Sequence, residues 1–175
     1  LLFLSCPACL MADNAALAAA MLRHQSTVTV SDESMAHGIH TAKWPARLQR
    51  LGSGPLTVLA AGRTVWLDGG HNRDAGEAIA RHFSGKRLHL ILGMLANKDP
   101  ASITAPLAGS IVSLQTVEIP GHDSHPRGAY GPNARPADDV PVALTALPDD
   151  GLPVLIAGSL YLAGKVLALN GEIPE

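Results

Sequence analysis

From residue 56 onward, short apolar runs alternate along the chain with segments whose apolar residues recur at helical spacing. The run 87–95, RLHLILGML, is almost continuously apolar, which is typical of a strand buried on both faces of a sheet. In RDAGEAIARHF (73–83), by contrast, a helical repeat is formed by Ala75, Ala78, Ile79, His82 and Phe83. These patterns predict strands at 44–51, 55–62, 63–70, 87–95, 110–119 and 152–158. They predict helices at 73–83, 99–109, 138–147 and 159–171, with a Pro/Gly-rich loop at 120–137.

Alternating strands and helices predict βαβ units, and therefore an α/β fold of the Rossmann-like type. We expect a mainly parallel sheet of about six strands with helices on both of its faces. Two further helices are predicted before this region, at 13–25 and 31–42. Asp13 and Ser31 are their expected N-caps, because side-chain oxygens of these residue types accept from the free N–H groups at a helix start.

The composition is that of a globular chain, since 47% of the residues are hydrophobic and 16% are charged. The formal net charge is −2 and no basic stripe is present, which disfavours nucleic acid as a partner. No apolar run is long enough to span a bilayer, so we expect no membrane partner. Cys6 and Cys9 form a C-x-x-C pair without two further zinc ligands nearby, and we interpret them as ordinary thiols of a cytoplasmic chain. The histidines show no metal-ligand spacing, so no metal site is predicted.

Polar residues follow three of the predicted strands, at WLDGGHN (66–72), LGMLANKD (92–99) and LIAGSLY (155–161). In an open α/β sheet, ligands bind beyond the carboxyl ends of the strands. The first of these ends places an acid, Asp68, and an imidazole, His71, around two glycines that would let a ligand approach the backbone closely. These three strand ends are therefore the candidate binding site.

Each polar residue at these ends also has a purely structural interpretation. Asn72 would cap the following helix, and Asp68 would accept from amides of its own turn. Lys98 is either a point charge for a carboxylate or phosphate or a solvated loop residue. Ser159 stands at a helix N-terminus, where free N–H groups bind anions, and it is also an expected N-cap; both interpretations can hold together.

Two arginines precede the candidate site, in WPARLQRL (44–51). Arg47 and Arg50 lie on opposite faces of the predicted strand, and each is either a phosphate ligand or an exposed charge on an edge strand. The chain has no G-x-x-x-x-G-K-[ST] phosphate loop and no G-x-G-x-x-G after a strand. A nucleotide bound here would therefore be held without its main phosphate loop, or that loop would lie on another segment.

Five motifs in chain order resemble the C-terminal part of the dihydrofolate synthase/folylpolyglutamate synthase family, relatives of the Mur peptide ligases. They are DNAALAAAMLR, WPARLQRL, WLDGGHN, LGMLANKD and AGSLYLAG, and they extend over most of residues 12–171. Enzymes of this family use ATP and Mg²⁺ to activate a carboxylate of dihydropteroate or folate as an acyl phosphate, which L-glutamate then attacks. The resemblance implies that residues 1–42 are the tail of the ATPase domain and that 43–175 form the C-terminal glutamate-ligase domain.

The resemblance also implies roles for individual residues, by the positions that they match. The implied nucleotide ligands are Asn14, Arg47 and Asp68. The implied catalytic residues are His71 and Ser159, which together with Lys98 are also the implied substrate ligands. Because Asp68 is expected at a strand end and not in the core, we predict that Asp68→Ala in a complete enzyme weakens ATP use more than folding.

The family's phosphate loop lies on an ATPase domain that this chain does not contain, so we expect that domain as a partner and no ligase turnover by the chain alone. Residues 122–137 are Pro/Gly-rich where the family usually has a helix. Two other hypotheses remain open: a non-catalytic module that binds a nucleotide or a partner protein, and the C-terminal domain of a cell-wall Mur-type amide ligase.

Overall fold

The computed structural model describes the backbone of residues 9–172 and the side chains of residues 12–172. The chain divides into two compact units, Leu1–Pro45 and Ala46–Glu175. Cys6 lies outside the described residues, as does the side chain of Cys9. None of the described helices combines the length and the apolar character that crossing a bilayer requires.

The first unit contains two helices, α1 (Cys9–His24) and α2 (Asp32–Thr41). Ser31 caps α2 as expected, because its hydroxyl accepts from the Ser34 amide at 3.1 Å. The expectation for Asp13 was wrong, since α1 already begins at Cys9 and Asp13 lies inside it. The Leu, Met and Ala residues that precede Asp13 are strong helix formers, and they extend the helix toward the N-terminus.

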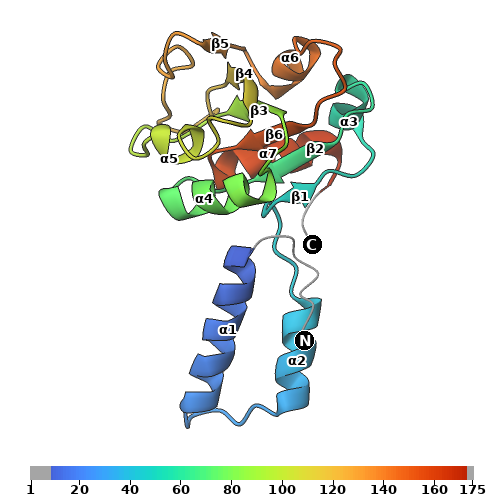
Figure 1. Cartoon of the computed structure of the whole chain (residues 1–175). Coiled ribbons are helices and arrows are strands. Elements are labelled where there is room, and N and C mark those ends of the chain that lie inside the picture. The colour runs from blue at the N-terminus through green and yellow to red at the C-terminus, as the bar shows by residue number, and fades with distance from the viewer. Residues whose placement is uncertain (1–8, 173–175) are drawn as a thin grey trace. The chain divides into compact units, whose positions relative to one another are not determined.

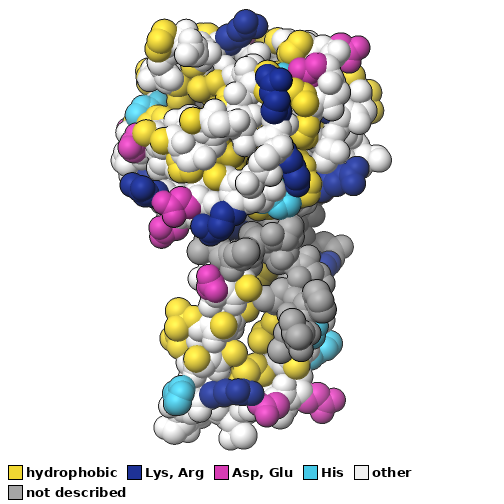
Figure 2. Space-filling view, in the orientation of Figure 1, with side chains coloured by type: hydrophobic (Ala, Val, Ile, Leu, Met, Phe, Trp, Pro, Cys, Tyr) yellow, Lys and Arg dark blue, Asp and Glu magenta, His cyan; other side chains and the backbone are white. Residues whose placement is uncertain are grey.

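The surface of the first unit carries hydrophobic side chains, which Figure 2 shows. Leu17 and Met21 lie one helical turn apart on α1 and are 61% and 65% exposed. Leu22 and Val28 are also exposed. Within the described residues, this unit therefore leaves apolar area of α1 facing solvent.

The second unit is built on a six-stranded sheet, counted over the described residues (Figure 1). The strands are β1 (Gln49–Arg50), β2 (Val65–Asp68), β3 (Leu88–Leu92), β4 (Ile111–Thr116), β5 (Ala134–Pro136) and β6 (Val154–Ala157). Their order is β1-β2-β6-β3-β4-β5, and every neighbouring pair is parallel except β1–β2. The predicted α/β fold with a mainly parallel sheet is confirmed.

Helices cover both faces of this sheet (Figure 1). On one face lie α4 (Arg73–His82) and α5 (Ala101–Thr104), which pack against each other; on the other lie α3 (Pro55–Leu59), α6 (Val140–Thr145) and α7 (Leu160–Asn170). Because side chains alternate along a strand, β2 contributes to both layers. Leu67 belongs to the core under α3, α6 and α7, whereas the ring of Trp66 contacts His82 and Phe83 of the α4 layer at centroid distances of 4.9 and 6.0 Å.

Residues 55–59 form helix α3, so the predicted strand at 55–62 was wrong. Pro55 stands at the first helical position, where its missing N–H costs nothing. Asn170, at the end of α7, accepts from the Leu56 amide at 3.0 Å and donates to the Gly52 carbonyl at 3.0 Å. This contact between residues distant in the sequence supplies the helix start with a hydrogen-bond partner that local sequence reasoning could not see.

The predicted strand at 44–51 is also mostly absent, because only Gln49–Arg50 pairs with β2. Ala46 and Leu48 have positive φ values of 56° and 41°, which breaks the extended alternation that the sequence suggested. Both side chains are buried, while Trp44 is 54% exposed. The segment is thus a tight turn followed by a short edge strand.

Residues 120–137 are irregular, as predicted, except for the short strand β5 at their end. β5 runs parallel to β4, with Thr116 opposite Pro136. The sheet therefore has six strands, as predicted, but one of them differs from the prediction. The sixth strand is β5 and not residues 55–62.

His89 is a fully buried histidine of β3 that takes part in a chain of hydrogen bonds. Its Nδ1 lies 2.7 Å from the Ser113 hydroxyl, and its Nε2 lies 3.0 Å from the Asp150 carboxylate. Two hydrogen bonds lower the pKa of Asp150: the larger effect comes from His89 and the smaller from the Leu152 amide. His89 therefore ties the loop before β6 to the middle of the sheet.

The contact between α4 and α5 depends on Gly76. A Cβ at this position would lie 2.1 Å from the Ser102 carbonyl oxygen, which belongs to the α5 backbone and cannot rotate away. We expect Gly76→Ala to lower the free energy of unfolding by about 1–3 kcal/mol, because the clash outweighs the better helix propensity of alanine. Gly164→Ala in α7, where the added methyl meets nothing within 4 Å, is the matched control and should stabilise by up to about 1 kcal/mol. Equal effects in urea unfolding would contradict this account of the helix contact.

The lowered pKa of Asp150 predicts a dependence of stability on acid. Since its folded pKa is below the ordinary value of 3.8, its contribution is present above that value and is lost as the pH falls through the folded pKa. Asp150→Asn should therefore lower the melting temperature at pH 7, and the difference from the unmodified chain should shrink below about pH 4. Asp149→Asn should have little effect at either pH, because this neighbour is fully exposed and its 3.7 Å ion pair with Arg63 is long and screened by water. A difference that stays constant down to pH 2.5 would show that the carboxylate charge is not the cause.

Candidate functional site

The three polar strand ends lie side by side at one edge of the sheet. In the parallel register, Asp68 at the end of β2 is opposite Ala157 of β6, Ala157 is opposite Leu92 of β3, and Leu92 is opposite Thr116 of β4. The turns after β2, β6 and β3 therefore leave the sheet next to one another. This edge, called the carboxyl edge below, brings together the segments that the sequence singled out.

The carboxylate of Asp68 joins two turns at this edge. Its Oδ2 accepts from the Leu48 amide at 2.8 Å, and its Oδ1 accepts from the Gly70 amide at 2.6 Å. A backbone bond from the Gly69 amide to the Ala46 carbonyl, at 2.8 Å, runs beside them. The turn before β1 is thus fastened to the turn after β2.

Asp68 is 5% exposed, so it is at the strand end, as predicted, but it is buried. Burial raises its pKa, and the hydrogen bonds from Leu48 and Gly70 and the charge of Arg47 act in the opposite direction. A buried carboxylate that satisfies two backbone amides contributes to folding. The premise that Asp68 lies outside the core was therefore wrong, and its loss should affect stability as well as binding.

Two glycines follow Asp68, and each lies against a neighbouring element. A Cβ on Gly69 would come within 2.3 Å of the Leu160 side chain of α7 and within 3.0 Å of the Arg47 guanidinium. A Cβ on Gly70 would lie 2.6 Å from the Ala75 Cβ of α4. The small size of both residues lets the two helices begin close to the end of β2.

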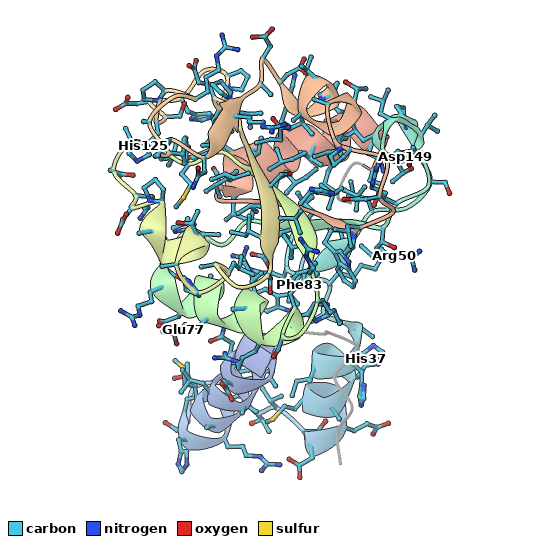
Figure 3. All side chains as sticks on the ribbon, turned by 45° about the horizontal axis from the view of Figure 1, so that its top comes forward. His37, Arg50, Glu77, Phe83, His125 and Asp149 are labelled. Carbon is cyan, nitrogen blue, oxygen red and sulfur yellow. The ribbon has the colours of Figure 1, made fainter. Side chains whose placement is uncertain are left out.

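Arg47 is half-buried in the turn before β1, and its Nη1 donates to the Ala46 carbonyl at 3.1 Å. Its position beside Gly69 places it at the carboxyl edge. Arg50 instead lies on β1 opposite Trp66 and is exposed, as Figure 3 shows. Of the two arginines, Arg47 is the one that the fold brings to the candidate site.

Two helices begin at the carboxyl edge with the caps that the sequence suggested. The Asn72 side chain accepts from the Ala75 amide at 2.9 Å and caps α4. The Ser159 hydroxyl accepts from the Tyr161 amide at 3.1 Å and caps α7. Ser159 is buried, so its hydroxyl is held in place at the start of this helix.

His71 directly precedes the Asn72 cap and is half-buried, with its Nδ1 at 3.2 Å from the Gly69 carbonyl oxygen. That contact leaves its Nε2 available for another partner. A cation (Arg47), an imidazole (His71) and the N-termini of α4 and α7 therefore occur at the same edge. Such an arrangement suits anionic groups, because free N–H groups and positive charge both favour them.

Lys98 belongs to the loop after β3 and is half-buried. Its amide donates to the Leu95 carbonyl at 3.0 Å, and its carbonyl accepts from the Nε2 of His125 at 2.7 Å. Asp99 caps the following turn by accepting from the Ala101 amide at 2.9 Å. His125 was not singled out as a site residue, and no motif in the sequence marks it.

Asn14, the remaining predicted site residue, is exposed on α1 in the first unit. A metal ion has no evident binding group in the described residues, because no three His, Cys, Asp or Glu side chains lie close enough together to hold one.

Comparisons with known proteins give a consistent set of relatives. No family model matches the chain. Folylpolyglutamate synthase of Lacticaseibacillus casei is 29% identical over 152 residues, which are 81% of this chain and 33% of that protein. A probable bifunctional folylpolyglutamate synthase/dihydropteroate synthase of Haloferax volcanii is 30% identical over 169 residues, or 88% of this chain and 19% of that protein.

Among solved structures, E. coli FolC in complex with DHPP and ADP is similar with a TM-score of 0.67 and 27% identity, over 89% of this chain and 38% of that one. The chain spans about a third of the length of the L. casei relative and less of the H. volcanii one. By sequence and by fold, the chain is homologous to the C-terminal portion of folylpolyglutamate synthases/dihydrofolate synthases, and it has their Mur ligase-like fold.

Proposed function

We propose that the chain forms the C-terminal part of an ATP-dependent ligase that adds L-glutamate to dihydropteroate or to folates. The observation that carries this proposal is the similarity to folylpolyglutamate synthases over 81% and 88% of the chain. The carboxyl edge supports it independently, because a cation, an imidazole and two helix N-termini gather there. The names of these relatives favour folate substrates over those of a cell-wall ligase.

The proposed reaction has two steps. A carboxylate oxygen of the folate precursor attacks the γ-phosphorus of ATP, and ADP leaves. The amino nitrogen of L-glutamate then attacks the acyl carbon, loses a proton and expels phosphate. Water must be kept out meanwhile, because it would hydrolyse the acyl phosphate, and closure of one domain over another does this in many enzymes.

The chain would contribute charge and positioning to these steps. Arg47, with a guanidinium at the carboxyl edge, would hold phosphate oxygens through paired N–H donors. Asp68 keeps the turn that carries Arg47 fastened to β2. His71 and Ser159, at the starts of α4 and α7, are the proposed glutamate-handling and closure residues, and Lys98 is a proposed substrate ligand. The described residues offer no metal cluster, so no step is assigned to Mg²⁺ in this chain.

The two units have separate roles in this proposal. The first unit, with Asn14 on α1, would be the end of the ATPase domain, and the second unit would be the glutamate-ligase domain. The exposed Leu17 and Met21 support this assignment, since apolar side chains that gather on a helix surface mark an interaction site. Asn14 is the proposed nucleotide ligand of the first unit.

The first test is a ligation assay with ATP, Mg²⁺, L-glutamate and dihydropteroate. The chain contains no phosphate loop, so we expect no turnover by the chain alone and glutamate-dependent release of ADP when a separately prepared ATPase domain of the family is added. The added domain alone is the control. Release of ADP by the pure chain would contradict the need for that domain, and a mixture that binds nucleotide without ligation would favour a non-catalytic binding module.

Substitution of Arg47 should mainly weaken ATP binding, whereas substitution of Asp68 should also destabilise the fold. We expect Arg47→Ala to raise the KM for ATP in the complemented assay by about tenfold, roughly 1.4 kcal/mol, with little change in the melting temperature. Asp68→Asn keeps the shape but turns an amide donor toward a backbone N–H, which should lower the free energy of unfolding by about 1–3 kcal/mol. Arg50→Ala, at the exposed position on β1, is the control for Arg47. The assignment fails if Arg47→Ala and Arg50→Ala change the KM equally.

A further inference from the structure

The loop after β3, residues 93–98, is held by the segment 121–130, which follows β4. Leu95 and Ser124 form an isolated antiparallel bridge, and the Ala96 amide donates to the Asp123 carbonyl at 3.0 Å. These contacts join two irregular loops that leave neighbouring parallel strands at the carboxyl edge. Loops are ordinarily the mobile parts of a fold, so a backbone pairing between two of them restricts both.

Met94, the second residue of this loop, has both of its backbone groups hydrogen-bonded to the segment 121–130. Its carbonyl accepts from the His125 amide at 2.9 Å, and its amide donates to the Tyr130 hydroxyl at 3.0 Å. Burial raises the pKa of Tyr130, the Met94 bond lowers it and the charge of Glu118 raises it, so the phenol stays protonated. The rings of His125 and Tyr130 meet edge-on at 5.8 Å, so the two side chains support each other.

The end of the same loop is fastened by the side chain of His125. Its Nε2 lies 2.7 Å from the Lys98 carbonyl oxygen, and a carbonyl only accepts, so this nitrogen carries the proton. One histidine thus bonds to both ends of the loop, through its backbone at Met94 and through its ring at Lys98. Figure 3 shows His125 on the side of the second unit opposite Asp149, which precedes β6 and therefore marks the other edge of the sheet.

Lys98 takes part in none of the ion pairs found among the described residues, so its charge is open to a ligand. A lysine stem has four rotatable bonds, and binding through it costs less conformational entropy when its backbone is already fixed. We propose that His125 and Tyr130 are positioning residues that hold the loop 93–98 so that Lys98 meets an anionic group of the substrates. The group is a phosphate or a carboxylate, and this inference rests on the proposed function.

Amide hydrogen exchange on the 175-residue chain tests whether His125 and Tyr130 hold the loop 93–98, and it does not require ligase activity. We expect Tyr130→Phe to speed exchange at Met94, whose amide loses its acceptor, by roughly 3- to 10-fold, the range that one net hydrogen bond represents. His125→Ala should speed exchange at Lys98 by a similar factor, because the freed Lys98 carbonyl loosens the turn in which the Lys98 amide bonds to Leu95. Tyr130→Phe keeps the ring and removes only the hydroxyl. His122→Ala is the matched control, because His122 stacks on Tyr161 of α7 at 3.8 Å and removing its ring should leave Met94 and Lys98 unchanged.

Kinetics in the complemented assay test whether the hydrogen bonds from His125 and Tyr130 affect binding through Lys98. We expect His125→Ala to raise one KM, for ATP or for L-glutamate, by about 5- to 10-fold with kcat nearly unchanged. Lys98→Met should raise the same KM, which identifies the anionic group as phosphate or carboxylate. The double variant should be no worse than Lys98→Met alone, because the two residues would act in series. His125→Gln, which keeps an N–H donor at a similar reach, should restore most of the loss.

Each outcome decides one of the two proposals. Unchanged exchange at Met94 and Lys98 would overturn the positioning role even if ligation occurs. A fall in kcat with both KM values unchanged, additive losses in the double variant, or no rescue by glutamine would overturn it as well. If the mixture with the unmodified chain shows no ligation, the proposed function fails, and the exchange rates then decide whether His125 and Tyr130 hold the loop.

Discussion

The carboxylate of Asp68 accepts one hydrogen bond from the turn before β1 and one from the turn after β2, and it does so away from water. Removing a partner of a buried carboxylate is costly, so neither turn can move without losing a bond. Arg47 lies between Ala46 and Leu48, the two residues of the first turn whose backbone groups bond to the turn after β2. Gly70 lies just before the start of α4. The position of the turn that carries Arg47 therefore depends in part on this side chain.

The rest of the edge is organised by close contacts between turns. Gly69 admits the Leu160 side chain of α7, and Gly158, with a φ of 111°, lies where a Cβ would come within 2.7 Å of the Gly93 carbonyl oxygen. Only glycine adopts this positive φ without strain and fits at this distance without a clash. Two helices and the loop after β3 can consequently begin within a short distance of one another, which is what a site for a small anionic group requires.

The two sides of the carboxyl edge are stabilised in different ways. On the β2 side, a buried charge bonds to backbone amides. On the β3 side, the imidazole of His125 and the phenol of Tyr130, both in a Pro/Gly-rich segment, bond to the backbone of the neighbouring loop. The first set of bonds belongs to the turn after β2 and the turn before β1, whereas the second comes from the irregular segment that follows β4.

Local patterns in the sequence determined the alternation of strands and helices, the buried strands β3 and β6, and the caps at Ser31, Asn72 and Ser159, because each depends on neighbouring residues. They also placed three polar strand ends at one edge, since parallel strands share their direction. Tertiary structure alone decided that 55–59 is a helix, because Asn170 supplies its hydrogen-bond partner, and that Ala46 and Leu48 turn with positive φ. It also decided that Asp68 is buried and that His125 reaches Lys98. Those contacts join residues far apart in the sequence, and no local periodicity records them.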